Sequence, residues 1–163
     1  MARRGLIAGS IAVTVLMAGA LKGVLRRFEI KESSMSPTLE SGDWVLARRR
    51  SSTLHRGDIV VIDDPMGTGL NLVKRVIGVP GEHMGIESGR VTVNGVVLAD
   101  RWADGVTEPS GEWDVVDGEV WVLGDNRPQS RSDSRTFGPI PVASVRWHVV
   151  ARYWPSSRVG MVS

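Results

Sequence analysis

The chain of 163 residues contains no cysteine. Disulfide bridges, cysteine-ligated zinc sites and thiol catalysis are therefore excluded. Aromatic residues are scarce apart from six tryptophans, whereas glycine is frequent, with 19 residues. No window after residue 30 shows a sustained period of 3.6 residues, so long helices are not expected there. This composition favours a turn-rich β protein over a helix bundle.

Acidic residues are absent from the first 27 positions, which contain the basic residues Arg3, Arg4, Lys22, Arg26 and Arg27. The formal net charge of +2 therefore divides into +5 for this segment and −3 for the remainder. A nucleic-acid-binding domain carries its basic charge on the folded part, so no nucleic-acid partner is expected. Basic residues that flank an apolar run are typical of a membrane surface, which makes membrane lipid an expected partner.

The N-terminal segment contains an uncharged run over residues 5–21. This run approaches the roughly 20 apolar residues that a helix needs to cross a bilayer. We therefore expect a short cytoplasmic stub and a transmembrane anchor over residues 1–27, followed by a β-rich domain over residues 28–163. Within that domain, about residues 82–118 are expected to form a small extension or loop subdomain.

The same run also resembles a cleavable signal peptide, because Arg3 and Arg4 precede it and residues 18–20 resemble a small-residue cleavage site. Three basic residues would follow that cut at once, however, and early positive charge hinders export. We therefore favour an anchor that is not removed.

The remainder of the chain consists of short apolar runs broken by glycine, proline, aspartate and asparagine, which is typical of strands. Asn94-Gly95 between two such runs is the strongest hairpin signal in the chain. Residues 100–118 are polar and contain glycine, so we expect an irregular loop or a small subdomain there. The predicted strands cover residues 43–47, 58–62, 72–79, 90–93, 96–98, 119–123 and 145–154.

The first segment with catalytic potential is residues 32–39. It offers the hydroxyl groups of Ser33, Ser34 and Ser36, close to a turn at Pro37. An ordinary loop also contains such residues, so this segment alone does not identify a nucleophile.

The second segment, residues 73–81, places a lysine inside an apolar strand, although burying an ammonium group is costly. Strand alternation puts Lys74 on the face of Leu72 and Val76, and Arg75 on the opposite face. One of the two basic side chains is therefore expected to point inward or into a cleft. Burial would lower the pKa of Lys74, as a general base near neutral pH requires. The alternative is that both side chains lie at a sheet edge with their charged groups in water.

The third segment, residues 124–135, is dense in serine, aspartate and arginine. It predicts either a surface loop stiffened by ion pairs or the supporting residues of an active site. His55, His83 and His148 have no catalytic or metal-ligand motif around them, so we expect no ordinary triad, no metal and no cofactor. A serine with a lysine base is the better-supported nucleophilic pair.

Four motifs in this order resemble the signal peptidase I family of serine–lysine membrane peptidases, including its mitochondrial inner-membrane branch. The resemblance covers most of residues 28–155. The family patterns Ser-Met-x-Pro-Thr-Leu, Arg-Gly-Asp-Ile-Val, Lys-Arg-Val-x-Gly-x-Pro-Gly-Asp and Gly-Asp-Asn-Arg-x-x-Ser-x-Asp-Ser-Arg correspond to residues 34–39, 56–60, 74–82 and 124–135, with Glu82 in place of the third pattern's final Asp.

The resemblance implies coiled antiparallel β-sheets at the extracytoplasmic face of the cell membrane, held by a single-pass anchor. It implies a serine endopeptidase that removes signal peptides from exported preproteins after small residues. The nucleophile would be Ser34 and the general base Lys74. The oxyanion and supporting residues would be Ser34, Met35, Ser130, Ser132, Asp133 and Arg135, and the substrate-binding residues Phe28 and Ile30.

The sequence departs from the family pattern at two positions near the expected site. Glu32 stands where many members carry serine or glycine, and its carboxylate would repel an oxyanion. Counted back from Asp133, Arg131 stands where the family has serine, as if one residue were inserted in the fourth motif. Ser130 and Ser132 lie on either side, so either serine could support Lys74. Two alternatives stay open at this point: a dedicated maturation protease for one partner protein, and a membrane-tethered β scaffold whose catalytic site is spoiled.

Overall fold

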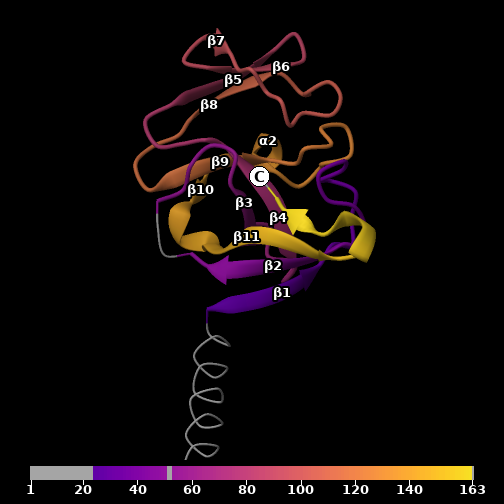
Figure 1. Cartoon of the computed structure of the whole chain (residues 1–163). Coiled ribbons are helices and arrows are strands. Elements are labelled where there is room, and N and C mark those ends of the chain that lie inside the picture. Colours follow the sequence, from indigo (N-terminus) through magenta and orange to yellow (C-terminus); the bar gives the residue numbers. More distant parts are fainter. Residues whose placement is uncertain (1–23, 51–52, 163) are drawn as a thin grey trace, which may run out of the picture.

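The chain is mainly β, as predicted, and the computed structural model describes residues 24–50 and 53–162 (Figure 1). Its larger sheet runs in the order β1-β2-β11-β3-β4-β9-β10, with β12 paired to β11. All these pairings are antiparallel. The strands are β1 (Leu25–Glu29), β2 (Trp44–Arg49), β3 (Ile59–Asp63), β4 (Asn71–Gly78), β9 (Glu119–Leu123), β10 (Ile140–Pro141), β11 (Val145–Trp154) and β12 (Gly160–Met161).

A second, four-stranded sheet follows the order β7-β6-β5-β8. Figure 1 shows it at one end of the molecule, with β1 at the opposite end. The predicted hairpin at Asn94 joins two of its strands, and Asn94 has the positive φ that this turn requires. The strands are β5 (His83–Glu87), β6 (Arg90–Val93), β7 (Val96–Val97) and β8 (Gly111–Asp114); the helical elements are α2 (Ser134–Phe137) and the 3₁₀ turns η1 (Val142–Ser144) and η2 (Ser156–Arg158).

The centre of the larger sheet is buried on both faces. In β3, Val60 and Ile62 pack in one hydrophobic cluster, whereas Ile59 and Val61 pack in another. A third cluster, around Trp121, lies against the smaller sheet. Because apolar side chains cover both faces, β3 and β4 form a rigid support for the polar residues that they carry.

The structure differs from the sequence-based expectations at two places. β1 begins at Leu25, so residues 25–27 belong to the sheet rather than to the anchor in which we placed them. Residues 100–118, expected to form an irregular loop or a small subdomain, contain the strand β8, which was not predicted and which pairs with β5. A strand with one large apolar residue, Trp113, gives too weak an alternation for recognition from the sequence.

Residues 1–23, which make up most of the predicted anchor, lie outside the described residues. Within residues 24–50 and 53–162, no helix has the length and apolar character needed to cross a membrane.

Candidate active site

Ser34 and Lys74 meet in the interior of the protein. Ser34 lies in the connection between β1 and β2, and Lys74 lies within β4. The Lys74 Nζ atom is 3.0 Å from the Ser34 Oγ atom. Ser34 is 8% exposed and Lys74 only 2% exposed. A hydroxyl and an amine at this separation, largely removed from water, have the geometry of a nucleophile and its general base.

The buried position of Lys74 changes its acidity. Removal from water lowers the pKa of the Lys74 ammonium below its ordinary value of 10.5, because burial disfavours the charged form. Asp133 and Glu32 oppose this shift, whereas the positive charge of Arg135 adds to it. The net direction favours the neutral amine, which is the form that can accept a proton.

Ser130 supports Lys74 from the other side. Its Oγ atom lies 3.3 Å from the Lys74 Nζ atom and donates a hydrogen bond of 2.7 Å to Asp133. The only hydroxyl proton of Ser130 is directed at Asp133, so toward Lys74 the Ser130 oxygen can act only as a hydrogen-bond acceptor. The lone pair of a neutral Lys74 is then left for the Ser34 hydroxyl. Ser132, the other serine considered from the sequence, is exposed and makes no such contact among the described residues.

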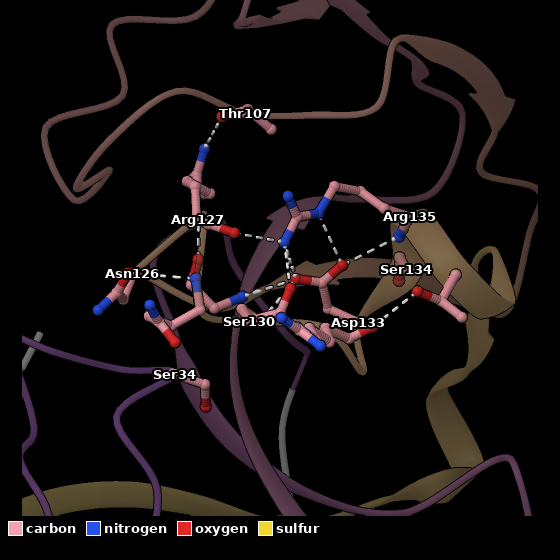
Figure 2. A network of polar contacts seen from close by, with 12 residues as sticks. Ser34, Thr107, Asn126, Arg127, Ser130, Asp133, Ser134 and Arg135 are labelled. Atoms are coloured by element: carbon pink, nitrogen blue, oxygen red, sulfur yellow. Dashed lines mark hydrogen bonds and ion pairs between the residues drawn. The ribbon is translucent and has the colours of Figure 1, made fainter.

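Asp133 is held in place by Arg135, as Figure 2 shows. The Arg135 guanidinium donates to both Asp133 carboxylate oxygens, at 2.9 and 2.8 Å, and also to the carbonyl oxygens of Arg127 and Ser130. Asp133 also caps α2 by accepting from the Arg135 backbone N–H. Asp133 and Arg135 thus fix the Ser130 hydroxyl without touching Ser34.

The loop around Gly124 fixes the nucleophile. The Asn126 backbone N–H donates to the Ser34 carbonyl oxygen at 3.1 Å. A Cβ atom at Gly124 would collide with the Ser130 side chain and with that same carbonyl oxygen. Glycine is therefore needed here for the close approach of three chain segments.

Arg75 is buried together with Lys74, which corrects the expectation that one of the two basic side chains would point inward. Arg75 and Asp125 are both fully buried and form a two-point ion pair, at 2.8 and 2.7 Å. Thr38 donates to the same carboxylate at 2.6 Å, which links the loop of Ser34 to β4. The pairing was not foreseen because Asp125 is distant in sequence, although both residues lie in motifs quoted above.

Arg127 forms a second buried ion pair near the site, which sequence reasoning also missed. Its guanidinium contacts Asp100 at 2.5 Å, Thr107 at 2.9 Å and the Gly124 carbonyl oxygen at 3.0 Å. Arg127 thereby ties the segment around residues 100–107 to the loop that holds the nucleophile. The sequence offered one signal for this pair, an arginine inside a polar motif, because arginine is rarely buried unless it has a partner.

An apolar cavity of about 270 Å³ opens beside the Ser34–Lys74 pair. Its lining includes Phe28 and Ile30, the two residues expected to bind substrate, together with Leu72 from β4. Met35, expected among the supporting residues, is buried in the core next to Ser34, so its side chain stabilises the loop. Glu32 lies at the mouth of this cavity, exposed to solvent.

Comparison with known proteins identifies the family of the chain. Residues 3–154 match the family model described as signal peptidase, peptidase S26. A probable signal peptidase I of Synechocystis is 32% identical over 92% of this chain and 85% of its own length. Subunit 1 of the mitochondrial inner membrane protease of Xenopus tropicalis is 31% identical, over 78% of this chain and 68% of its own length.

A solved structure of a signal peptidase I has a similar fold. The crystal structure of a signal peptidase I from Enterococcus faecalis superposes with a TM-score of 0.50 at 29% identity, covering 59% of this chain and 96% of that one. The chain therefore belongs to the signal peptidase family, peptidase S26, and is a serine endopeptidase.

Proposed function

We propose that this chain removes signal peptides from exported preproteins, with Ser34 as nucleophile and Lys74 as general base. The observation that carries the proposal is the 3.0 Å separation of the Ser34 hydroxyl and the Lys74 amine inside a site from which water is largely excluded. Relatives described as signal peptidase I support the choice of substrate.

The chemistry follows from the hydrogen bonds of the pair. Neutral Lys74 accepts the hydroxyl proton of Ser34 as the Ser34 oxygen attacks the scissile carbonyl carbon. The resulting ammonium is stabilised by Asp133 through the Ser130 hydroxyl. It then donates its proton to the leaving amine, and a water molecule attacks the acyl-enzyme through the same base in the second half of the reaction.

The Ser34 backbone supplies a donor for the oxyanion. Within the described part of the chain, the Ser34 N–H donates no hydrogen bond to another protein group. It is therefore free to bind the developing negative charge, and one such donor is worth roughly 10²–10³ in rate. Glu32 is exposed, so its carboxylate can point into solvent and away from that charge.

The edge of the larger sheet offers a place for an extended substrate. β1 ends the strand order on one side, and Phe28 and Ile30 at its end line the apolar cavity. A peptide that pairs with such an edge places alternate side chains into the cavity. Small residues at the first and third positions before the cut would lie in this cavity, as the family resemblance implies.

The site also fits a membrane enzyme with an anchor before β1 and its catalytic domain on the extracytoplasmic side of the cell membrane. The basic residues near the start of β1, Arg26 and Arg27, would then lie close to anionic lipid headgroups. A cut site that emerges just outside a bilayer would be within reach of Ser34.

The test is turnover of purified preproteins by the full-length chain in detergent. Ser34→Ala and Lys74→Ala should each lower kcat/KM by about 10³-fold or more, with unchanged circular dichroism. Ser110→Ala, which removes an exposed hydroxyl outside the site, serves as the control and should retain activity. Parental activity in either of the first two variants contradicts the proposal, and cleavage of several unrelated preproteins separates it from a maturation protease with one substrate.

A further inference from the structure

Two cavities of opposite character meet at the Ser34–Lys74 pair. The apolar cavity described above lies on one side, and a cavity of about 500 Å³ lies on the other. Ser34, Lys74, Glu32 and Lys31 line both, so the reacting atoms lie at their junction. An extended substrate that crosses this junction has its residues before the cut in one cavity and its residues after the cut in the other.

The second cavity is polar. Beyond the shared residues it is lined by Ser33, Ser41, Gln129, Arg131 and Ser132. The apolar cavity takes the small residues before the cut in the proposed function, on which this inference rests. The polar cavity is then left for the first residues of the released protein.

Arg131 is the charged residue that lines the polar cavity but not the apolar one. Its side chain is exposed, and within the described residues it makes no hydrogen bond or ion pair. It also borders a third, open cavity that contains Glu108, but no ion pair with Glu108 is present. The guanidinium is therefore available to a ligand.

The position of Arg131 in the chain brings it close to the reacting atoms. It directly follows Ser130, whose Oγ atom is 3.3 Å from the Lys74 Nζ atom. An extended peptide advances about 3.3 Å per residue, so three residues after the cut span about 10 Å. An arginine side chain anchored next to Ser130 reaches side chains within that distance.

We propose that Arg131 makes this enzyme favour substrates with an acidic side chain among the first three residues after the cut. A carboxylate there pairs with a guanidinium that otherwise lacks a partner in the described structure. Lys31 and Glu32, which also line this cavity, carry opposite charges that offset each other. The site is open to solvent, so the gain is modest and falls as salt screens the charges.

The experiment compares kcat/KM of the full-length chain in detergent for three preproteins that carry Glu, Gln or Lys at the second position after the cut. The parental enzyme should prefer Glu over Lys by about two- to fivefold, and less at high salt. Arg131→Glu should reverse this order. Arg90→Glu, which makes the same charge change at the exposed first residue of β6, should keep the parental order.

Unchanged ratios in Arg131→Glu, or an equal change in Arg90→Glu, overturn the inference while leaving the proposed function intact. No turnover of any of the three substrates by the parental enzyme overturns the proposed function and this inference with it.

Discussion

The Lys74 amine lies 3.3 Å from the Ser130 hydroxyl, which donates its own hydrogen bond to Asp133. Lys74 is thereby held between two serines, one that it activates and one that orients it. Of the two serines, only Ser34 can donate a proton to the Lys74 amine. The hydrogen bond from Ser130 to Asp133 therefore determines the direction of proton transfer.

Removing the Ser130 hydroxyl should therefore disturb the orientation of Lys74. We expect Ser130→Ala to lower kcat by up to about 10²-fold with little change in KM, because the substrate contacts stay intact. Steady-state kinetics on one preprotein measures both parameters. Ser110→Ala, which removes an exposed hydroxyl outside the site, should match the parental enzyme, and equal losses in the two variants would argue against a specific role for Ser130.

Glu32 opposes the effect of burial on Lys74. Removal from water lowers the pKa of the Lys74 ammonium, whereas the Glu32 carboxylate favours the ammonium form and acts to raise that pKa. Glu32→Gln should lower that pKa, so the neutral fraction at any pH below it increases. The acidic limb of the kcat/KM profile should then move to lower pH.

Glu87→Gln makes the same change at an exposed position of β5, and its profile should overlay the parental one. A shift of the Glu32→Gln profile to higher pH would show that Glu32 does not act through Lys74.

The buried Arg75–Asp125 pair should be important for stability. Asp125→Ala leaves the Arg75 guanidinium buried without its partner, which we expect to lower the free energy of unfolding by about 3–5 kcal/mol. Urea denaturation measures this change. The double variant Arg75→Met/Asp125→Leu removes both charges and should recover most of the loss; a double variant as unstable as the single one would mean that the residues act through packing alone.

Gly124 should be needed for activity because of the space around it. Gly124→Ala places a methyl group against Ser130 and the Ser34 carbonyl oxygen, which displaces the nucleophile loop. We expect kcat/KM to fall by about 10²-fold. Gly160→Ala, at a glycine with open space around its Cα atom, should keep parental activity. Parental activity in Gly124→Ala would contradict the close approach of these segments.

Local patterns were sufficient to predict much of the fold. Asn94-Gly95 predicted its hairpin because only a few residues adopt that turn readily, and β3 was recognisable as a continuous apolar run. β5 and β8 were missed because His83–Glu87 and Gly111–Asp114 contain few large apolar residues. Their pairing depends on contacts between segments far apart in the chain.

The candidate site shows the same division. Lys74 was singled out as a candidate because burying a charged residue within an apolar strand costs free energy. The choice between Ser130 and Ser132 depended on the conformation of one loop, which the sequence does not determine locally. The burial of Arg75 depended on Asp125, 50 residues away in the chain.

The most direct test of the account is the pKa of Lys74 itself, measured by ¹⁵N NMR titration of the lysine side chains in the full-length chain in detergent. The chain contains three lysines, Lys22, Lys31 and Lys74, so the signal can be assigned by its loss in Lys74→Met. The account predicts that Lys74 titrates below its ordinary value of 10.5, at the pH of the acidic limb of kcat/KM. Titration of Lys74 at its ordinary value of 10.5 would contradict a neutral lysine base beside Ser34.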